Sequence, residues 1–345
     1  MANTKCTIKD IARLAGVSKG TVDRVLHNRG KVSKRAAEKV ERILKEIDYQ
    51  PNPIAQNLKN NKVYRINVLM PSANDDPYWA PAHYGILEAA KEFKPFGIIV
   101  DEFFYYPNDE TSFLEKSMEA LDPSPDALLM APLFQKEAEI TFKKCQELNI
   151  PVALFDNYIK SLKGKIFIGQ DLYQSGRVAA SLIDKIIDRD ARISIVHINL
   201  EPHMELKEKG FIDYFEQKGG RHLITTYSFN TESSVDFEND TSIFFKENPT
   251  ISAMFVTNSK TYRLKRVLER TGKKIIVVGY DLLEQNIKCL KEGTIDFLIH
   301  QKPKQQAYLG VGYLAEHFLF GKEIPAQDLL PIDIITSENV QYYLK

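Results

Sequence analysis

The sequence predicts an α/β protein in which a small three-helix head precedes a larger body of parallel sheets covered by helices. Two observations carry this prediction. The first ~60 residues repeat apolar side chains at helical spacing around a tight turn. The ~283 residues that follow alternate short apolar runs with amphipathic stretches, which is typical of parallel sheets buried on both faces. That length suits two subdomains better than one small core.

Residues 7–26 predict two short helices joined by a tight turn. Thr7 can cap the first helix, and Asp10 stands three residues later, where it completes a pair resembling a capping box. Gly16 supplies the turn because glycine tolerates a positive φ, and Ser18 is a suitable cap for the second helix. We expect the inward-facing side chains to be Ile8, Ile11, Ala12 and Ala15 in the first helix, and Val22, Val25 and Leu26 in the second.

A third, longer helix follows, with Ser33 expected as its cap. Its apolar stripe is Ala37, Val40, Leu44 and Ile47. Three short helices around one core form the arrangement that lays its second helix in the major groove of DNA. The linker Tyr49-Gln50-Pro51-Asn52-Pro53 comes next and has room for one further short helix.

The charge distribution agrees with a nucleic-acid partner for the head. Residues 1–62 hold 14 lysines and arginines against 6 acidic residues, so the remaining residues hold 32 against 40. The net charge of zero therefore conceals a head of about +8 on a body of about −8. A basic cluster is typical of phosphate binding. A basic charge by itself would also fit a helical face exposed to solvent. Together with the turn and the helix caps, it favours nucleic-acid binding.

The outward positions at the start of the second helix are Lys19, Gly20 and Arg24. We expect these positions to reach base edges, and lysine and arginine suit guanine O6 and N7. Other basic residues are expected to meet phosphates. These are Lys9, Arg29, Lys31, Lys34 and Arg35.

In the body, polar residues stand at the ends of nearly all the predicted strands. We expect strands at residues 66–70, 98–104, 127–131, 152–155, 166–169, 193–198, 253–256 and 275–279, with helices at 85–93, 137–148 and 173–187. Ligands of parallel sheets bind beyond the carboxyl ends of the strands. Amides and carboxylates there can bind hydroxyls, and aromatic rings can pack on a sugar ring. The candidate ligand residues from this pattern are Asn74, Asp76, Tyr78, Trp79, Asp156, Asn157, Asp171, Asn258, Asp281 and Gln301.

Other functional classes find little support in the sequence. We find no catalytic motif and no metal-binding spacing among the seven histidines, so we expect no enzyme, no metal and no cofactor. The Gly-x-Gly-x-x-Ala run at 310–315 lies inside an apolar helical stretch, which favours helix packing over dinucleotide binding. Three scattered cysteines, no apolar leader and no membrane-length apolar window predict a cytoplasmic protein without a membrane partner.

The head resembles that of the lac repressor family, which includes the galactose and purine repressors. The segments TIKDIARLAGVSKGTVDRVL and YQPNPIAQNL carry the resemblance. It implies a hinge helix that folds on DNA, with Asn52 as cap, Pro53 in its first turn, and Ala55 and Leu58 facing the minor groove. The full set of expected DNA-binding residues is Thr7, Ser18, Lys19, Gly20, Thr21, Arg24, Asn28, Arg29, Asn52, Ala55 and Leu58.

Two residues depart from the family's usual head. Asp23 stands where the family usually has serine, and its carboxylate could accept a hydrogen bond from cytosine N4 or repel a phosphate. Gly20 is unusual in a reading helix and costs about 1 kcal/mol of helix propensity relative to alanine. The absence of a side chain at Gly20 could permit close approach of the backbone to DNA, or it could limit the base contacts to Lys19 and Arg24.

The body resembles the ribose-binding branch of the periplasmic sugar-binding-protein fold. The matching segments, in order, include INVLMPSANDDPYW, IPVALFDN, IGQDLYQSGRVAA, AMFVTN, IIVVGYD and DFLIHQKP. The resemblance implies that Asp76, Tyr78 and Trp79 occupy polar and ring-stacking positions. It implies that Asp156, Asn258, Asp281 and Gln301 bind hydroxyls. Where the family usually has arginine, this chain has Glu205 and Lys207; either Lys207 takes over as the cation, or neither side chain reaches the site.

The resemblance also implies the organisation of the chain. The expected divisions are a helix-turn-helix domain at 1–50, a hinge at 51–63, an N-terminal effector subdomain at 64–170 with 302–330, and a C-terminal effector subdomain at 171–301 with 331–345. The implied function is a homodimeric repressor that binds operator DNA and responds to a sugar. The alternatives are a sugar sensor whose head engages a partner other than DNA, and an enzyme of sugar metabolism.

Overall fold

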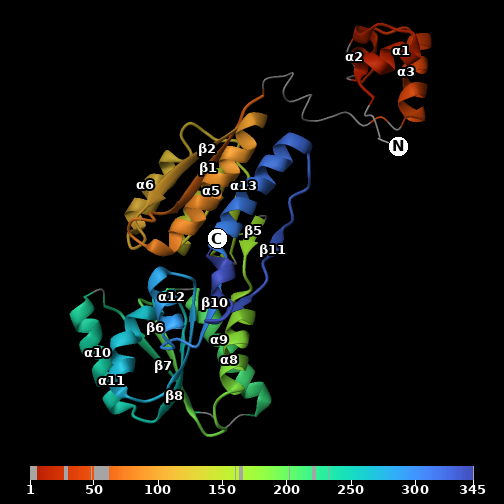
Figure 1. The fold of residues 1–345 in the computed structure, drawn as a ribbon. Coiled ribbons are helices and arrows are strands. Elements are labelled where there is room, and N and C mark those ends of the chain that lie inside the picture. Colours follow the sequence, from red (N-terminus) through yellow and green to blue (C-terminus); the bar gives the residue numbers. More distant parts are fainter. Residues whose placement is uncertain are drawn as a thin grey trace. The chain divides into compact units, whose positions relative to one another are not determined.

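The computed structural model describes residues 6–26, 30–47, 49, 62–159, 161–162, 166–201, 203–219, 223–231 and 233–344. The chain divides into two compact units, a head at 1–60 and a body at 61–345 (Figure 1). The predicted hinge helix with Asn52, Ala55 and Leu58 lies outside the described residues, as do Asn28 and Arg29.

The head is the predicted bundle of three helices. They are α1 (Ile8–Ala15), α2 (Lys19–Leu26) and α3 (Lys34–Glu46). All three bury side chains in one shared core, because each helix repeats apolar residues on a single face. The fully or nearly fully buried members are Ile11, Ala12, Ala15, Val22, Val40 and Ile43.

The sequence correctly predicted how α1 and α2 begin, but not how α3 begins. Thr7 and Asp10 form a capping box: the Asp10 N–H donates to Thr7 Oγ1 at 3.4 Å, and the Thr7 N–H donates to Asp10 Oδ2 at 3.0 Å. Gly16 ends α1 with φ 63°, and Ser18 Oγ accepts from the Thr21 N–H at 3.2 Å. Ser33 occupies the cap position of α3 but makes no side-chain capping bond, so that expectation is corrected.

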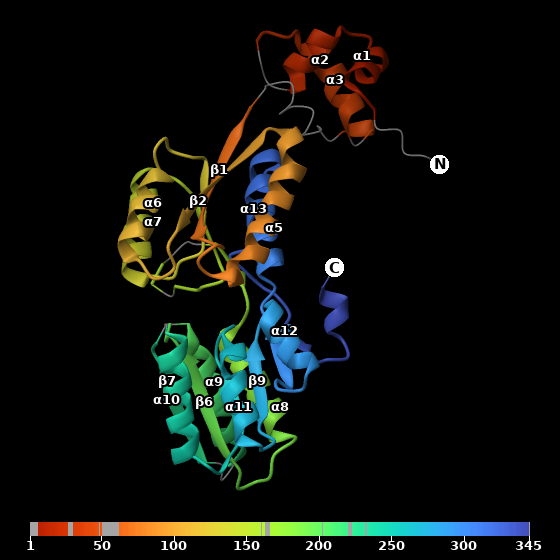
Figure 2. The ribbon, with the colours of Figure 1, turned by 60° about the vertical axis from the view of Figure 1, so that its left-hand side comes forward.

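The first lobe of the body is built on a six-stranded parallel sheet (Figures 1 and 2). Its strand order is β11-β5-β4-β3-β1-β2. The strands are β1 (Tyr64–Pro71), β2 (Ile98–Tyr105), β3 (Ala127–Met130), β4 (Val152–Phe155), β5 (Ile166–Gly169) and β11 (Gln327–Leu329). The helices are η1 (Pro77–Trp79), α5 (Ala80–Phe93), η2 (Lys94–Phe96), α6 (Glu110–Glu119), α7 (Gln135–Glu147) and α13 (Pro303–Phe320).

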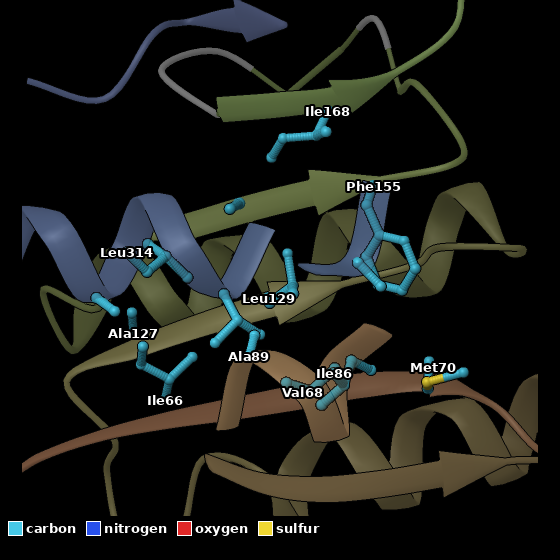
Figure 3. Close-up of a cluster of buried hydrophobic side chains, with 14 of the residues drawn as sticks. Ile66, Val68, Met70, Ile86, Ala89, Ala127, Leu129, Phe155, Ile168 and Leu314 are labelled. Atoms are coloured by element: carbon cyan, nitrogen blue, oxygen red, sulfur yellow. The ribbon is translucent and has the colours of Figure 1, made fainter. Parts of the chain in front are cut away.

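Both faces of the central strands β1, β3, β4 and β5 are buried, which explains why these strands are mostly apolar. Successive side chains of a strand point to opposite faces. Val68 of β1 therefore belongs to the same buried cluster as Ile86 of α5 and Leu314 of α13, and Figure 3 shows part of this cluster. Leu69 packs on the other face with Phe113 of α6.

The Gly-x-Gly-x-x-Ala run lies inside α13, as the sequence predicted. A Cβ on Gly310 would lie 2.7 Å from Leu129 Cδ1, so this glycine lets the helix approach the sheet closely. The run therefore serves helix packing.

The second lobe has a similar sheet with the order β12-β10-β9-β8-β6-β7, parallel except for β12 (Figure 2). The strands are β6 (Arg192–Ile198), β7 (Leu223–Phe229), β8 (Ile251–Val256), β9 (Ile276–Tyr280), β10 (Phe297–His300) and β12 (Asp333–Ile335). The helices are α8 (Leu172–Asp184), α9 (Met204–Lys218), α10 (Ser234–Glu247), η3 (Thr261–Leu264), α11 (Lys265–Thr271), α12 (Glu284–Lys291) and η4 (Val340–Tyr343).

The eight strands predicted from apolar runs are all present, whereas β7, β10, β11 and β12 were not among the predicted strands. β7 lies at the sheet edge and leaves most of its side chains exposed, so it has no apolar run to reveal it. β11 and β12 are three residues each and find their partners only through the tertiary structure.

The chain crosses between the lobes three times. The crossings follow β5, precede α13, and join β11 to β12. The described residues contain no helix with the length and apolarity that a membrane span requires.

Candidate functional site

A cavity of about 620 Å³ lies between the two lobes of the body, and both lobes line it. Because the carboxyl ends of parallel strands meet at one edge of each sheet, the loops there face the gap. The sequence-predicted residues that line the cavity are Asp76, Tyr78, Trp79, Asp156, Lys207, Asn258, Asp281 and Gln301.

Three predicted ligand residues do not line the cavity and are corrected. Asn74 is exposed in the loop after β1. Asn157 is buried outside the lining, where its N–H donates to the Phe155 carbonyl at 2.8 Å. Asp171 caps α8, and its carboxylate accepts from the Gln174 N–H at 2.8 Å. A polar residue after a strand can thus begin the next helix instead of facing a ligand.

Tyr78 links the polar groups of the two lobes. Its hydroxyl donates to Asp156 Oδ1, and Gln301 Nε2 donates to the Tyr78 oxygen at 3.4 Å. Burial, followed by the nearby carboxylates, raises the pKa of Tyr78, so the hydroxyl stays protonated. The cavity therefore holds a preformed chain of hydrogen bonds before any ligand enters.

Trp79 is more a core residue than the sequence suggested. Only 2% of its surface is exposed. It packs edge-on against Tyr78, with ring centroids 5.0 Å apart, and against Phe155 at 6.2 Å. The indole lines the cavity but offers it little of its face, because the ring belongs to the packed cluster of the first lobe.

Asp156 and Asp281 occupy equivalent places in the two lobes. Asp156 follows β4 with φ 67°, and Asp281 follows β9 with φ 62°. Each donates its N–H to the neighbouring strand, to Ile168 at 3.1 Å and to Ile299 at 2.9 Å respectively. Non-glycine residues rarely adopt this left-handed backbone, although aspartate tolerates it better than most. Such conformations are often found at functional sites.

Both carboxylate oxygens of Asp281 accept hydrogen bonds from Gln301. Gln301 donates its backbone N–H to Oδ1 at 2.9 Å and its Nε2 to Oδ2 at 2.7 Å. Gln306 of α13 in turn donates its Nε2 to the Gln301 carbonyl at 2.7 Å, while its Oε1 accepts from the Asp156 N–H at 2.8 Å. Gln301 and Gln306 therefore join the carboxylate positions of both lobes at the second crossing.

Lys207 lines the cavity, which excludes the alternative that neither side chain reaches it. It is fully buried on α9, its Nζ donates to the Thr257 carbonyl at 3.0 Å, and it lies 3.8 Å from the centre of the Tyr280 ring. Burial lowers its pKa to about 8, against the attraction of Asp281, Asp156 and Glu201. Glu205, the other residue at the arginine's usual place, does not line the cavity.

Asn258 lines the cavity and also stabilises the loop after β8. Its Nδ2 donates to the Ile198 carbonyl at 2.6 Å, and its Oδ1 accepts from the Lys260 N–H at 3.2 Å. The amide therefore shapes the loop after β8 while it lines the cavity. Asn286 of α12 stabilises the same loop, since its Nδ2 donates to the Ser259 carbonyl at 2.7 Å.

Several carboxylates of the cavity hold their protons more tightly than usual. Burial raises the pKa of Asp156 to about 6 although Tyr78 and Lys207 oppose the shift. Burial also raises the pKa of Glu201 to about 7, and that of Asp76 above its usual value. Each shift arises mainly because a carboxylate loses hydration in the cavity.

Sequence reasoning missed Glu201, His203 and Lys260, which also line the cavity. The rule used for the other strands would have found the first two, because they closely follow the end of β6. Lys260 stands two residues after Asn258 and could have been found in the same loop. Among the residues that the structure describes, no cluster of His, Cys, Asp and Glu could hold a metal ion.

The head exposes the residues that the sequence selected for base contacts. Lys19, Gly20 and Arg24 are exposed along α2, whereas Val22 is fully buried on its inner face. Ser18 and Thr21 join their hydroxyls at 3.0 Å at the start of the helix. Thr7 caps α1, so it has a structural part in addition to any contact with DNA.

Two family matches cover the head and the body. Residues 7–52 match the lacI family of bacterial regulatory proteins, and residues 66–323 match the periplasmic binding protein domain. The chain belongs to the lacI family of regulatory proteins. This lacI-family protein thus joins a DNA-binding head to a ligand-binding body, and the two matches confirm the resemblances found in the sequence.

Two operon repressors among the curated relatives are similar to this chain over most of its length. The sucrose operon repressor of Streptococcus mutans is 24% identical over 342 residues, which cover 96% of this chain and 99% of that protein. The ribose operon repressor of Halalkalibacterium halodurans is 23% identical over 80% of each chain. The NTD biosynthesis operon regulator of Bacillus subtilis is 38% identical over 109 residues, and this match spans only 32% of either protein.

Solved structures agree on the fold of the body. A LacI transcriptional regulator from Bacteroides fragilis is 31% identical, with a TM-score of 0.74 over 82% of this chain and all of that one. A glucose-galactose binding protein from Geobacillus stearothermophilus is 22% identical, with a TM-score of 0.72 over 81% of this chain and 99% of that one. The second likeness shows the fold alone.

Proposed function

We propose that this lacI-family protein represses an operon for carbohydrate use and responds to a sugar bound between the lobes of its body. The observation that carries the proposal is the cavity, because both lobes line it with polar groups at their strand ends. A ligand that contacts both lobes binds best when they are close together. It therefore stabilises one arrangement of the body over another.

The chemistry of the cavity supports a polyhydroxylated ligand. Ionised carboxylates accept hydrogen bonds from hydroxyls, and the lining offers them from Asp76, Asp156, Glu201 and Asp281. Tyr78 adds a hydroxyl and an aromatic ring. No cofactor is part of this proposal, because binding alone shifts the balance between the two arrangements.

A homodimer on a palindromic operator is the second part of the proposal. One head of ~60 residues makes a small interface with DNA, and a two-fold dimer doubles the base contacts. The first lobe carries exposed apolar side chains on the packed pair α5 and β2, including Tyr84, Leu87 and Ile99. Sedimentation of the protein, with and without a Leu87→Glu substitution, tests whether this surface joins two copies.

A mobility-shift titration at two salt concentrations tests the DNA-binding part. The probe is duplex DNA from upstream of the protein's own gene. Several phosphate contacts make the affinity fall steeply with salt. A specific, salt-dependent complex supports the regulator. Absence of any complex at low salt favours the alternative, in which the head engages a partner other than DNA.

An Asp281→Asn substitution tests the ligand-binding part. It removes the charge beside Gln301 and keeps an oxygen that can accept a hydrogen bond. We expect operator binding to persist while the response to sugar is lost. If the response is unchanged, Asp281 does not bind the ligand and the proposed cavity is wrong.

A further inference from the structure

The charges that line the cavity are strongly unbalanced. Its lining contains seven carboxylates and three lysines, and no arginine among the described residues. The carboxylates are Asp75, Asp76, Glu110, Glu137, Asp156, Glu201 and Asp281, and the lysines are Lys136, Lys207 and Lys260. Burial lowers the pKa of His203 well below its usual value, so this ring is neutral. The lining therefore has a formal charge of about −4 at neutral pH when its carboxylates are ionised.

The imbalance persists in the inner part of the cavity. There Lys207 is shared among Asp281, Asp156 and Glu201, whose charges all act on it. Lys260 acts on both Asp76 and Glu201. Two lysines thus face four carboxylates that come from both lobes. Closure of the lobes would remove water from this group, and an uncompensated buried charge is costly.

One carboxylate oxygen has been left open toward the cavity. Asp156 is only 8% exposed, and its Oδ1 accepts the Tyr78 hydroxyl. Among the described residues, no hydrogen bond to its Oδ2 is found. Because Asp156 lines the cavity, this oxygen can accept a hydrogen bond from a ligand. The atom is an acceptor, so the ligand must bring a donor.

We propose that the effector is a polyhydroxylated compound that carries an ammonium group, such as an aminated sugar, and that it is not a phosphorylated or acidic one. The proposal rests on the proposed function, because it uses the same cavity as the ligand site. An ammonium group supplies donors to the carboxylates and also neutralises part of their charge. A phosphate would add negative charge to a cavity that has no arginine to bind it.

A neutral sugar is the competing ligand class. It supplies hydroxyl donors but leaves the charge imbalance unchanged. The raised pKa values of Asp156 and Glu201 offer the protein another route to neutrality, which is to bind protons instead of a cation. The two classes therefore differ in whether affinity depends on a positive charge in the ligand.

Isothermal titration of the full-length protein with matched probes tests the proposal. The probes are D-glucose, D-galactose and D-mannose, each also as its 2-amino-2-deoxy form and its 6-phosphate, at neutral pH. We expect at least one aminated form to bind at least tenfold more tightly than its neutral parent, and the phosphates to bind worst. The proposal is overturned if no aminated form binds, or if a neutral or phosphorylated form binds as tightly as its aminated counterpart.

A pair of variants separates local recognition from general attraction. Glu201→Gln removes a charge from the inner cavity and disturbs little, since among the described residues its carboxylate pairs with His203 Nδ1 at 3.4 Å. Glu110→Gln removes the same charge at the exposed rim. We expect Glu201→Gln to reduce the preference for the aminated probe about tenfold and Glu110→Gln to leave it unchanged. An unchanged preference in Glu201→Gln, or an equal loss in both variants, contradicts the proposal.

These titrations do not involve DNA. A protein that binds aminated probes but no operator would refute the proposed repressor and leave the ligand class standing. A protein that binds operator and responds only to neutral sugars would support the proposed repressor and refute the aminated ligand class.

Discussion

The side-chain amide of Gln170 donates a hydrogen bond to the backbone carbonyl of Pro331 at 3.2 Å. The same Nε2 donates to the His300 carbonyl, also at 3.2 Å. These three residues lie in or beside the three crossings between the lobes, so one buried side chain joins all of them. Gln170 therefore holds the three crossings together by hydrogen bonds.

A Gln170→Ala substitution should destabilise the body. It leaves two carbonyl oxygens without this donor, and a buried polar group without a partner costs about 1–3 kcal/mol. Urea denaturation followed by circular dichroism measures the change. Gln146→Ala on the exposed face of α7 serves as the control and should alter the free energy of unfolding by less than ~0.5 kcal/mol. Equal effects of the two substitutions would show that the crossings do not depend on Gln170.

Gly210→Ala should destabilise the second lobe, because α8 and α9 meet at their backbones. A Cβ on Gly210 would lie 1.9 Å from the Tyr173 carbonyl oxygen, and a backbone atom cannot move aside easily. We expect a loss of about 1–3 kcal/mol. Gly312→Ala in α13 is the matched control, since its Cβ would lie 3.8 Å from Phe93. That substitution should be neutral or gain up to about 1 kcal/mol from helix propensity. Thermal denaturation distinguishes them, and a stabilised Gly210→Ala protein would contradict the observed packing.

Stability of the ligand-free protein should depend on pH through Asp156. Burial raises the pKa of this carboxyl from 3.8 to about 6. The folded state therefore binds more protons than the unfolded state in this window, and the free energy of unfolding falls as pH rises through it. Asp156→Asn should remove this fall, which amounts to at most about 3 kcal/mol. Denaturation at several pH values measures it. Glu110→Gln at the exposed rim is the control and should leave the pH profile of the free energy of unfolding unchanged. If Asp156→Asn also leaves that profile unchanged, Asp156 is not the cause of the fall.

Arg24→Ala should weaken operator binding mainly at one base pair. The side chain is exposed on α2, and arginine pairs with guanine through two hydrogen bonds. The expected loss of discrimination is about 1–3 kcal/mol at that position. Binding to a set of operators with single substitutions measures it. Arg42→Ala on α3 is the control, because Arg42 is exposed and pairs with Glu46 at 3.7 Å. If Arg24→Ala weakens all sequences equally, Arg24 contacts a phosphate.

The sequence by itself determined the helices of the head and most of the strands of the body. The capping box of Thr7 and Asp10 and the turn at Gly16 depend on neighbours within four residues, so local reasoning found them. The central strands are buried on both faces, and their unbroken apolar runs are visible in the sequence. The charge contrast between head and body was visible by counting.

Only the tertiary structure decided which polar residues line the cavity. Asp156 and Asp171 both follow strands of the first lobe, yet the first faces the cavity and the second caps a helix. Trp79 stands in a polar loop but packs into the core. Lys207 lies on α9, and its ammonium group reaches the Thr257 carbonyl just beyond the end of β8, which is 50 residues away in the sequence. The direction of each of these side chains depends on residues far away in the sequence, so local pattern could not fix it.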